Sequence, residues 1–476
     1  MKIIVDKPYL ALSLNNDAPP QRVVMSHEGK EVWALDAHVS ASPAYSCWLD
    51  VRRFMGMQLE VNLSEDAFFL TDELPKALYR ESLRPQTHFS ARTGWINDPN
   101  GLVYHNGVYH LFFQHNPAGN QWGNMHWGHA VSCDLVHWTQ EPIALYPDAL
   151  GTMFSGSAIV DERNVSGFGK GALLLFYTAA GDPFTQCMAW STDGEHFRKY
   201  EGNPIVPHIA GANRDPKVIW CEELGCYVMA LYLENNTYTL LLSDDLLHWR
   251  EHQRIELPGD SECPDFYPLC EEESGERFWI FSGASDRYLV GRFRDGLYVP
   301  EYSGALHDGP NVLYAAQTFS GIGGRRIRVS WNTANMQGMP FNCCISTPVE
   351  MRLRRIDGQL RLCAFPIPEF LEGLRDDENP AAWRLELELS GVSGASRLKI
   401  LDGEPIALDG APVRDGRLHV TVIADHSGYE AYFGQGEYIL ARGADGHYGL
   451  DREPASCIGG ECAVCCTGLA SIWNKK

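Results

Sequence analysis

The chain has 476 residues, 45% of them hydrophobic and 21% charged, with a formal net charge of −22 at pH 7. This length is enough for two or three domains with a large buried core, and the composition is that of an ordinary soluble globular protein. Nucleic acid and anionic membrane surfaces require clustered Lys and Arg, so neither is expected as a partner of so acidic a chain.

The first residues and the cysteines bear on the cellular compartment. Residues 1–8 lack the long apolar run and the small-residue cleavage site of a secretory signal, and no stretch approaches the roughly 18 apolar residues of a membrane span. The 14 cysteines are scattered along the chain, and without an export signal they are expected to stay reduced. We therefore expect a cytoplasmic protein without a membrane segment.

Residues 1–82 are predicted to form a small β-rich module. Trp48–Met55 and Met57–Leu63 alternate apolar and polar side chains with a period of two, as half-buried strands do. The region contains no group of residues typical of catalysis, so a structural role is favoured over a functional one.

Within the stretch His88–Val103, the segment Asn97–Gly101 (NDPNG) places turn-forming residues between an aromatic and an apolar pair. Proline holds φ near about −65°, and Asn and Gly tolerate positive φ, so we expect a sharp bend that carries the carboxylate of Asp98. An ordinary turn that closes a hairpin is the alternative, and it would be favoured if Asp98 stood alone.

Residues 83–370 are predicted to form a five-bladed β-propeller. Short aromatic strands alternate here with Gly, Pro, Asn and Asp, and the motif Ser-x-Asp-x-x-His-aromatic recurs at Ser132–Trp138, Ser191–Phe197 and Ser243–Trp249. A repeat of about 50–60 residues built from strands is typical of propeller blades, and a region of this length accommodates roughly five. Long helical periodicity is absent, which argues against a (β/α) barrel.

Residues 371–476 are predicted to form a β-sandwich, which makes the whole chain all-β. Leu385–Leu389, Leu418–Ile423 and Tyr429–Phe433 are expected strands between Gly- and Asp-rich turns. Four cysteines lie near the end of this region: Cys457, Cys462, Cys465 and Cys466. A zinc knuckle is the alternative there, but a strong zinc motif needs two Cys-x-x-Cys pairs at a proper separation, so reduced cysteines without a ligand are favoured.

Four further segments follow Asp98 at intervals of about 50–60 residues, the period of the blades: Phe154–Ser157, Arg214–Lys217, Ser261–Tyr267 and Tyr314–Gln317. Each segment is therefore expected at an equivalent place in its own blade. Since the inner strands of a propeller converge on one axial funnel, we expect Asp98, Asp215 and Glu262 to meet there.

Three carboxylates in one funnel are unfavourable unless a ligand uses them, because like charges raise one another's pKa. Glycosidic bond cleavage requires two carboxyl groups in different environments, one ionised nucleophile and one protonated acid. Aromatic side chains would supply walls for the apolar face of a sugar: Trp95, Trp122, Trp127, Phe154 and Tyr267. A metal site is the rival use of three acids, but hard cations prefer more oxygens and an Asp-rich loop, which the sequence lacks.

Six blocks carry a resemblance to a known family: Trp95–Gly101 (WINDPNG), His110–Pro117 (HLFFQHNP), Trp122–His129 (WGNMHWGH), Phe154–Ser157 (FSGS), Arg214–Pro216 (RDP) and Glu262–Pro264 (ECP). In this order, over about residues 86–370, they resemble glycoside hydrolase family 32, which holds invertases, levanases and inulinases. The resemblance implies a five-bladed propeller, a C-terminal β-sandwich and a retaining, double-displacement mechanism on β-D-fructofuranosides.

Position by position, the resemblance implies that Asp98 is the nucleophile, Glu262 the acid/base and Asp215 the transition-state stabiliser. Further side chains are expected to bind the substrate: Asn97, Gln114, Trp122, Phe154, Ser155, Arg214 and Tyr314. Glu262 would have to keep its proton near neutral pH, which partial burial and two neighbouring carboxylates favour. No cofactor and no metal ion is implied.

We therefore expect a hydrolase that releases terminal β-D-fructofuranosyl units from fructo-oligosaccharides, levan- or inulin-type fructans, or sucrose. The expected partner is thus a small-molecule or oligosaccharide fructoside. A fructosyltransferase that uses the same covalent intermediate is the first alternative, and a non-catalytic fructan-binding protein is the second. The presence of all three carboxylates argues against the binding protein. The preferred substrate, the role of the N-terminal module and the oligomeric state are left open.

Overall fold

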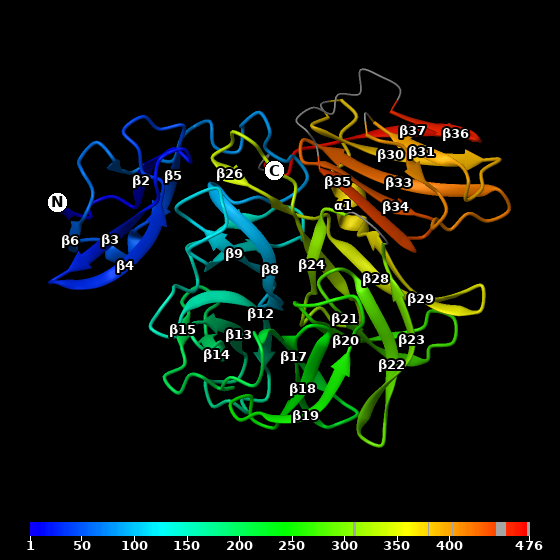
Figure 1. Ribbon diagram of the computed structural model, residues 1–476, viewed down its shortest axis with the longest axis horizontal. Coiled ribbons are helices and arrows are strands. Elements are labelled where there is room, and N and C mark those ends of the chain that lie inside the picture. The colour runs from blue at the N-terminus through cyan, green and yellow to red at the C-terminus, as the bar shows by residue number, and fades with distance from the viewer. Residues whose placement is uncertain (308–310, 379, 402, 444–453, 474–476) are drawn as a thin grey trace.

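The computed structural model describes residues 1–307, 311–378, 380–401, 403–443 and 454–473 (Figure 1). Strands form almost all of the regular structure in these residues, and the helices among them are a 3₁₀ turn, η1 (Arg52–Phe54), and one short α-helix, α1 (Pro368–Gly373). The prediction of an all-β fold is therefore confirmed. No helix in the described part of the chain is long and apolar enough to cross a membrane.

The N-terminal residues form two antiparallel sheets that enclose one core. In order, the first sheet contains β1 (Lys2–Ile4), β6 (Gln58–Val61), β3 (Gln21–His27) and β4 (Lys30–Ala37), and the second contains β5 (Tyr45–Asp50), β2 (Tyr9–Leu14) and β7 (Phe68–Thr71). Because successive side chains of a strand point to opposite faces, Val23 and Met25 of β3 are buried between the sheets while Arg22 is exposed. These strands make up the N-terminal module.

Five antiparallel sheets follow one another between Gly94 and Pro366. The first three are β8 (Gly94–His105), β9 (Val108–Asn116), β10 (His126–Ser132) and β11 (Thr139–Gln140); β12 (Thr152–Asp161), β13 (Ala172–Ala180), β14 (Thr185–Ser191) and β15 (Arg198–Lys199); and β16 (Arg214–Cys221), β17 (Cys226–Glu234), β18 (Thr237–Ser243) and β19 (Arg250–Glu256). The last two are β20 (Asp265–Cys270), β21 (Arg277–Ser282), β22 (Arg287–Arg294) and β23 (Leu297–Ala305); and β24 (Leu313–Thr318), β25 (Ile327–Asn332), β28 (Val349–Ile356) and β29 (Gln359–Pro366). Two short strands join them: β26 (Phe341–Asn342) runs parallel to β8, and β27 (Cys344–Ile345) pairs with β25.

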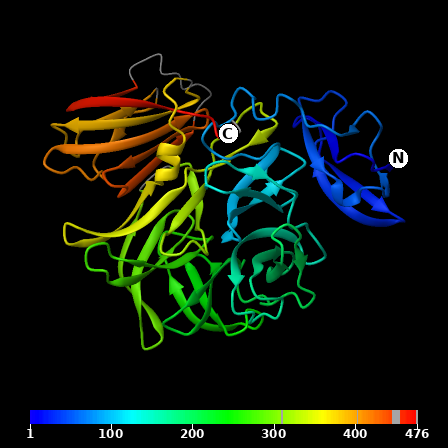
Figure 2. The same ribbon diagram turned by 180° about the vertical axis from the view of Figure 1, so that it is seen from behind.

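The first strands of the five sheets contact one another in sequence. β8 packs against β12, β12 against β16, β16 against β20 and β20 against β24, and β24 returns to β8. The sheets therefore surround a common centre, as the cyan, green and yellow strands show from both sides (Figures 1 and 2). This arrangement brings segments of the chain that are far apart in the sequence to one axis.

The repeated turn motif directly follows the third strand of the first three sheets, whose last residues are Ser132, Ser191 and Ser243. In the first copy, Ser132 Oγ donates a hydrogen bond to Asp134 over 3.0 Å, and His137 Nδ1 lies 2.8 Å from the same carboxylate. The other two copies make the same contacts. The motif is therefore a structural turn that leads into the fourth strand.

The C-terminal module also consists of two sheets around one core. One contains β35 (Tyr438–Gly443), β34 (Gly428–Phe433), β33 (Arg417–Asp425), β30 (Ala382–Ser390) and β37 (Glu461–Leu469), and the other contains β32 (Ile406–Ala407), β31 (Arg397–Ile400) and β36 (Ala455–Ile458). Of the four cysteines near the end of the chain, Cys465 and Cys466 are exposed. Among the described residues these cysteines form no group of three that could share a metal ion, which does not support the zinc alternative.

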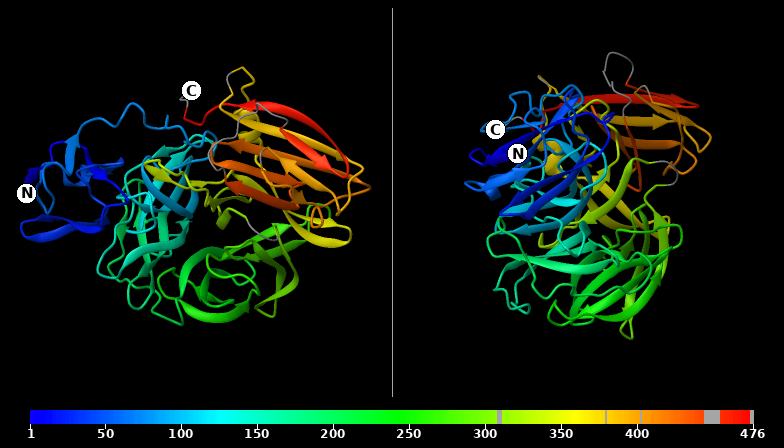
Figure 3. Two further views of the ribbon diagram at one scale, coloured as in Figure 1. Left: turned by 45° about the horizontal axis from the view of Figure 1, so that its top comes forward. Right: turned by 60° about the vertical axis from the view of Figure 1, so that its left-hand side comes forward.

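The N- and C-terminal modules lie on different sides of the central sheets (Figures 1 and 3). Against the N-terminal module, Trp33 Nε1 donates a hydrogen bond to Nε2 of the buried His126 over 3.0 Å. Against the C-terminal module, the buried ring of His88 lies between Asp425 and Glu430, 2.9 and 3.2 Å from their oxygens. The Trp33–His126 contact thus pairs neutral groups, and the His88 contact pairs buried charges.

Candidate active site

The segment Asn97–Gly101 does not close a hairpin, so that alternative is wrong. The segment lies inside β8, where the register with β9 shifts between Ile96 and Pro99 and again between Asn100 and Val103. The hairpin turn comes later, at Asn106 and Gly107, which have φ angles of 50° and 86°. The turn-forming residues therefore produce bulges in the first strand of a sheet, and such bulges re-aim side chains.

Hydrogen bonds from Asn97 and Ser155 hold the carboxylate of Asp98 in place. Asn97 Nδ2 donates to Asp98 Oδ1 over 3.1 Å, and Ser155 Oγ, from β12, donates to Asp98 Oδ2 over 2.5 Å. The amide of Asn97 is itself oriented, because Trp95 Nε1 donates to Asn97 Oδ1 over 2.8 Å. Burial raises the pKa of Asp98, and the hydrogen bonds from Ser155 and Asn97 oppose that rise.

Asp215 lies at the start of β16 in a strained backbone conformation. Its φ angle is 65°, which is unfavourable for a residue with a side chain, and its N–H donates to Thr178 Oγ1 over 2.9 Å. The carboxylate faces the centre, where Asp215 Oδ2 accepts a hydrogen bond from the N–H of Cys263 over 3.0 Å. Burial raises the pKa of Asp215 to about 7; Arg214 opposes this rise, and the charge of Asp98 adds to it.

Glu262 lies three residues before β20 and is joined to Asp215 by Arg214. Arg214 Nη2 lies 3.1 Å from Glu262 Oε1, and Arg214 Nε lies 3.7 Å from Asp215 Oδ2. Glu262 and Cys263 have φ angles of 58° and 38°, so two consecutive residues are left-handed at this point. Such strain persists where the surroundings enforce it, and it is most common at functional sites.

Cys263 connects the first two carboxylates, a role that the sequence did not indicate. Its Sγ lies 3.6 Å from Asp98 Oδ2 and 3.5 Å from Asp215 Oδ2. Burial and the neighbouring acids raise the pKa of this thiol well above its usual value, so it stays protonated and donates. The three acids thus form one connected group with Cys263 and Arg214, which we call the site cluster.

The structure places the remaining predicted substrate-binding residues at different depths. Gln114, in β9, is buried, and its Nε2 makes no hydrogen bond within the described part of the chain. Trp122 is 60% exposed and lies edge-on to Phe154, with 6.2 Å between ring centroids. Tyr314, in β24, is half-buried, which raises its pKa, as does the nearby charge of Glu262. Gln114 and Trp122 therefore offer a free donor and a free aromatic face.

The prediction of aromatic walls is wrong for two of the five side chains. Trp127 and Tyr267 are both fully buried, so neither presents a face to a sugar. Trp127 packs in an apolar core and donates Nε1 to the carbonyl of Phe154 over 3.0 Å. Successive residues in a strand point to opposite faces of the sheet. The face on which an aromatic side chain near an active-site motif lies is therefore known only when the register is known.

Sequence reasoning also missed residues beside the predicted ones. Trp331, in β25, packs against Trp95 with 5.8 Å between ring centroids, and its Nε1 makes no hydrogen bond among the described residues. Gln317, in β24, donates Nε2 to the carbonyl of Gly156 over 3.1 Å, while its Oε1 is likewise unpaired. Gln317 ends one of the four repeated segments, so the period indicated its place, but nothing in the sequence indicated Trp331.

One group in the described residues has the geometry to hold a metal ion: Asp215, Glu262 and Cys263, whose ligand atoms lie within 4.8 Å of one another. The guanidinium of Arg214 already lies 3.1 Å from Glu262 and opposes a second positive charge there. The thiol of Cys263, with its raised pKa, is also a poor ligand until it loses its proton. The geometry therefore favours an organic ligand over a cation.

Comparison with known proteins identifies the family. Residues 88–365, more than half of the chain, match the model of the glycosyl hydrolases family 32 N-terminal domain. The chain belongs to glycoside hydrolase family 32. The match covers the five central sheets and begins after the N-terminal module, so residues 1–87 lie outside the family domain.

Curated relatives and solved structures agree with this family. The chain is 35% identical over 358 residues to a levanase of Bacillus subtilis (strain 168), covering 68% of this chain and 52% of the levanase. It is 37% identical over 257 residues to an invertase of Schizosaccharomyces pombe, covering 48% of this chain and 44% of the invertase. The crystal structure of exo-inulinase from Aspergillus awamori superposes with a TM-score of 0.73 at 25% identity, over 83% of this chain and 100% of the inulinase chain. The chain thus spans about half the length of the first two relatives.

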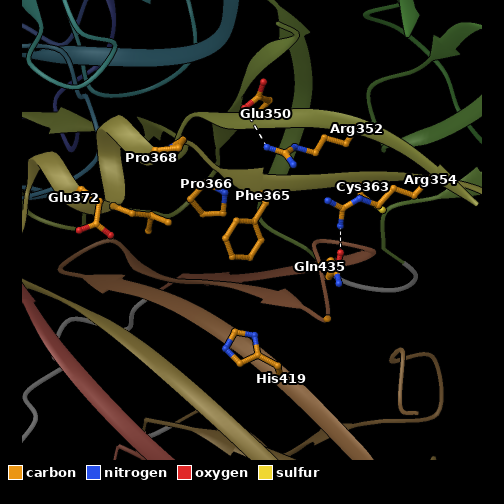
Figure 4. A pocket seen from close by; sticks show the side chains of 12 residues that line it. Glu350, Arg352, Arg354, Cys363, Phe365, Pro366, Pro368, Glu372, His419 and Gln435 are labelled. Carbon is orange, nitrogen blue, oxygen red and sulfur yellow. Dashed lines mark hydrogen bonds and ion pairs between the residues drawn. The ribbon is translucent and has the colours of Figure 1, made fainter. Parts of the chain in front are cut away.

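A cavity of about 450 Å³ in this family 32 chain lies between the fifth sheet and the C-terminal module (Figure 4). Strands β28 and β29 line one side, and His419 of β33 lies on the other. The arginines there have partners, because Arg352 lies 3.7 Å from Glu350 and Arg354 donates to Gln435. None of the site cluster lines this cavity, so we place the chemistry at the carboxylates.

Proposed function

We propose that this protein is a retaining β-fructofuranosidase that releases terminal fructosyl units from fructo-oligosaccharides, fructans or sucrose. The observation that carries the proposal is the site cluster itself, in which one buried carboxylate and two partly exposed ones surround a single arginine and a thiol. The levanase, invertase and exo-inulinase relatives support the same class of substrate.

In the proposed mechanism Asp98 attacks the anomeric carbon of the terminal fructose and forms a covalent fructosyl-enzyme intermediate. Ser155 and Asn97 hold both oxygens of its carboxylate in place, which fixes the direction of attack. Glu262, whose side chain is 36% exposed, protonates the departing oxygen and then removes a proton from the water that hydrolyses the intermediate.

Asp215 stabilises the positive charge that develops on the sugar ring. Its carboxylate is buried and preorganised by the Cys263 N–H and the strained backbone, so it does not need to reorient during the reaction. Gln114, with its unpaired donor, and the aromatic pair Trp122 and Phe154 would bind sugar hydroxyls and ring faces. A fructosyltransferase would use the same groups and differ in the acceptor that takes the place of water.

We also propose the finer division of the fold. The five central sheets, whose first strands contact one another in a ring, would be the blades of a five-bladed β-propeller spanning residues 83–370. Residues 1–82 would be a separate β module and residues 371–476 a β-sandwich, each with its own core. A cytoplasmic location and the absence of nucleic-acid partners stay predictions from the sequence.

The test is fructose release from sucrose, an inulin-type oligosaccharide and a levan-type oligosaccharide. Wild type is compared with Asp98→Ala and Glu262→Ala, and Glu201→Ala, at an exposed acid, is the control. We expect release from at least one substrate, loss of nearly all activity in the first two variants and unchanged activity in the control. Inactivity of wild type on all three substrates would overturn the proposal, and transfer to sugar at high sucrose would indicate the transferase.

A further inference from the structure

The loop between β9 and β10, residues 117–125, carries the most exposed aromatic side chain near the site cluster. We call it the rim loop. Trp122 in this loop is 60% exposed and points its ring toward Phe154, the residue next to Ser155. Because Ser155 binds the proposed nucleophile, the rim loop lies beside the site cluster, where the proposed mechanism places the substrate.

The N-terminal module contacts the rim loop near the C-terminal end of the loop, at Asn124. The side-chain amide of Asn124 pairs with both backbone groups of Asp36, at the end of β4: the Asp36 N–H donates to Asn124 Oδ1 and Asn124 Nδ2 donates to the Asp36 carbonyl, each over 2.7 Å. This pairing imitates the exchange between two strands and fixes the amide in one orientation. Asn124 also has a φ angle of 46°, a conformation that asparagine tolerates better than most residues.

A second anchor holds the middle of the rim loop. Tyr45, in β5, donates its hydroxyl to Asn16 Oδ1 over 2.7 Å and lies 3.1 Å from Asn120 Oδ1. Asn16 Nδ2 donates to the same oxygen of Asn120 over 2.8 Å, and Asn120 Nδ2 donates to the carbonyl of Met339 over 2.9 Å. Both sheets of the N-terminal module therefore contribute to one network of neutral hydrogen bonds around the loop.

The network continues to the residue before Trp122. Asn124 Nδ2 also donates to Asn116 Oδ1 over 2.9 Å, and Asn116 Nδ2 donates to the carbonyl of Gln121 over 2.8 Å. The backbone that carries Trp122 is thus connected through two asparagine amides to β4. The N-terminal core reaches the loop as well, since Ala118 is buried among its apolar side chains.

We propose that the N-terminal module is a positioning element for the substrate, which holds Trp122 through Asn124 and Tyr45 and so sets the affinity for the sugar units beyond the scissile bond. This inference rests on the proposed function. Ordering a free loop costs conformational entropy at every residue, and the hydrogen bonds of the two anchors offset that cost, so losing the anchors leaves Trp122 in several orientations. The consequence is weaker substrate binding with unchanged chemistry at the carboxylates.

The test compares Asn124→Asp and Tyr45→Phe with a matched control in the full chain. Asn124→Asp replaces the amide donor with a carboxylate oxygen that repels the Asp36 carbonyl. Asn62 makes the same type of pairing inside the module, with the Val24 N–H and the Arg22 carbonyl, so Asn62→Asp is the control. With an inulin-type trisaccharide we expect the KM of Asn124→Asp to rise about fivefold to tenfold, that of Tyr45→Phe about twofold, and kcat to change less than twofold. An unchanged KM, or an equal rise in Asn62→Asp, would overturn the inference.

A double-variant cycle shows whether the effect passes through Trp122. Trp122→Ala should raise KM by itself, and adding Asn124→Asp to it should produce no further rise. Additive effects would contradict the proposal. Trisaccharide binding to the same variants in an Asp98→Ala background gives the dissociation constant without turnover. Failure of the proposed function would appear as no fructose release by wild type, and failure of this inference as a dissociation constant that Asn124→Asp leaves unchanged.

Discussion

The molecule contains two groups of acids in which the pKa values of the carboxyl groups are shifted in opposite directions. The first is the site cluster, with Asp98, Asp215 and Glu262. The second, which we call the His88 cluster, joins the central sheets to the C-terminal module and contains His88, Asp425 and Glu430. Both are built from side chains that are far apart in the sequence, yet one compensates its charges and the other does not.

The His88 cluster is fully paired. Asp425 Oδ2 accepts hydrogen bonds from His88 Nδ1 and from the N–H groups of Gln86 and Thr87, each over 2.9 Å. Burial would raise the pKa of Asp425, but His88 and these donors hold it far below its usual value. Burial would lower the pKa of His88, but Asp425 and Glu430 raise it to about 10, so the ring stays charged.

The site cluster is incompletely paired. Asp98 and Asp215 have raised pKa values, because desolvation outweighs Arg214 and the hydrogen bonds from Ser155 and Asn97. Acids that hold the fold together therefore have a cation and hydrogen-bond donors supplied by the chain itself. Acids that take part in chemistry lack a full set of partners until a substrate binds, and this lowers the stability of the folded chain.

The largest stability effect is expected for His88→Gln. The variant leaves two buried carboxylates without a cation, which typically costs about 3–5 kcal/mol. Denaturant unfolding at neutral pH measures the loss, with wild type as reference. A loss below about 1 kcal/mol would mean that the His88 cluster does not hold the C-terminal module.

Asp215→Asn is expected to stabilise the folded chain, whereas His88→Gln is expected to destabilise it. Asp215 ionises with its ordinary pKa in the unfolded chain and at about 7 in the folded chain, so wild type loses stability as the pH rises from about 4 through 7. The variant lacks this loss and should be more stable than wild type at pH 8, by at most about 4 kcal/mol, and equally stable at pH 4. Unfolding free energies at both pH values check this, and the variant should release almost no fructose. If wild type were more stable than the variant at pH 8, Asp215 would not be incompletely paired in the site cluster.

Ser155→Ala tests a single hydrogen bond of the site cluster, the one from Ser155 to Asp98. Loss of a bond to a charged acceptor costs about 1.5–3 kcal/mol, so we expect kcat/KM to fall about tenfold to a hundredfold. The control is Ser166→Ala, because Ser166 Oγ donates to the buried Asp161 over 2.6 Å outside the site. The control should lose stability and keep its kcat/KM, and an equal loss of activity in both variants would remove the special role of Ser155.

The smallest effect is expected for His196→Gln. His196 pairs with Asp193 over 2.9 Å, as His88 does with Asp425, but its side chain is 81% exposed. Exposed pairs contribute about 0–1 kcal/mol, so thermal unfolding should change little. A loss as large as that of His88→Gln would show that burial is not what separates the two pairs.

The sequence predicted the all-β class and the periodic spacing that places Asp98, Asp215 and Glu262 on successive sheets. Spacing carries this information because each sheet repeats the same length of chain. The turn motif after Ser132, Ser191 and Ser243 supplied the period and proves to be structural.

Contacts that depend on three-dimensional packing were out of reach. His88 and Asp425 are 337 residues apart, and no local pattern marks either as a partner of the other. Whether Trp127 faces the funnel or the core depends on the register of β10, because a shift of one residue moves every side chain of a strand to the opposite face of the sheet. The link through Cys263 depends on two consecutive left-handed residues that the sequence did not indicate.

In the proposed mechanism Asp98 forms a covalent bond to fructose while Glu262 transfers the proton. The most direct measurement uses Glu262→Ala with β-D-fructosyl fluoride, whose leaving group needs no protonation, followed by mass spectrometry of the digested protein. We expect a fructosyl adduct that accumulates on the peptide containing Asp98 and is absent from Asp98→Ala. An adduct on another residue, or fluoride release by Glu262→Ala without any adduct, would contradict this mechanism.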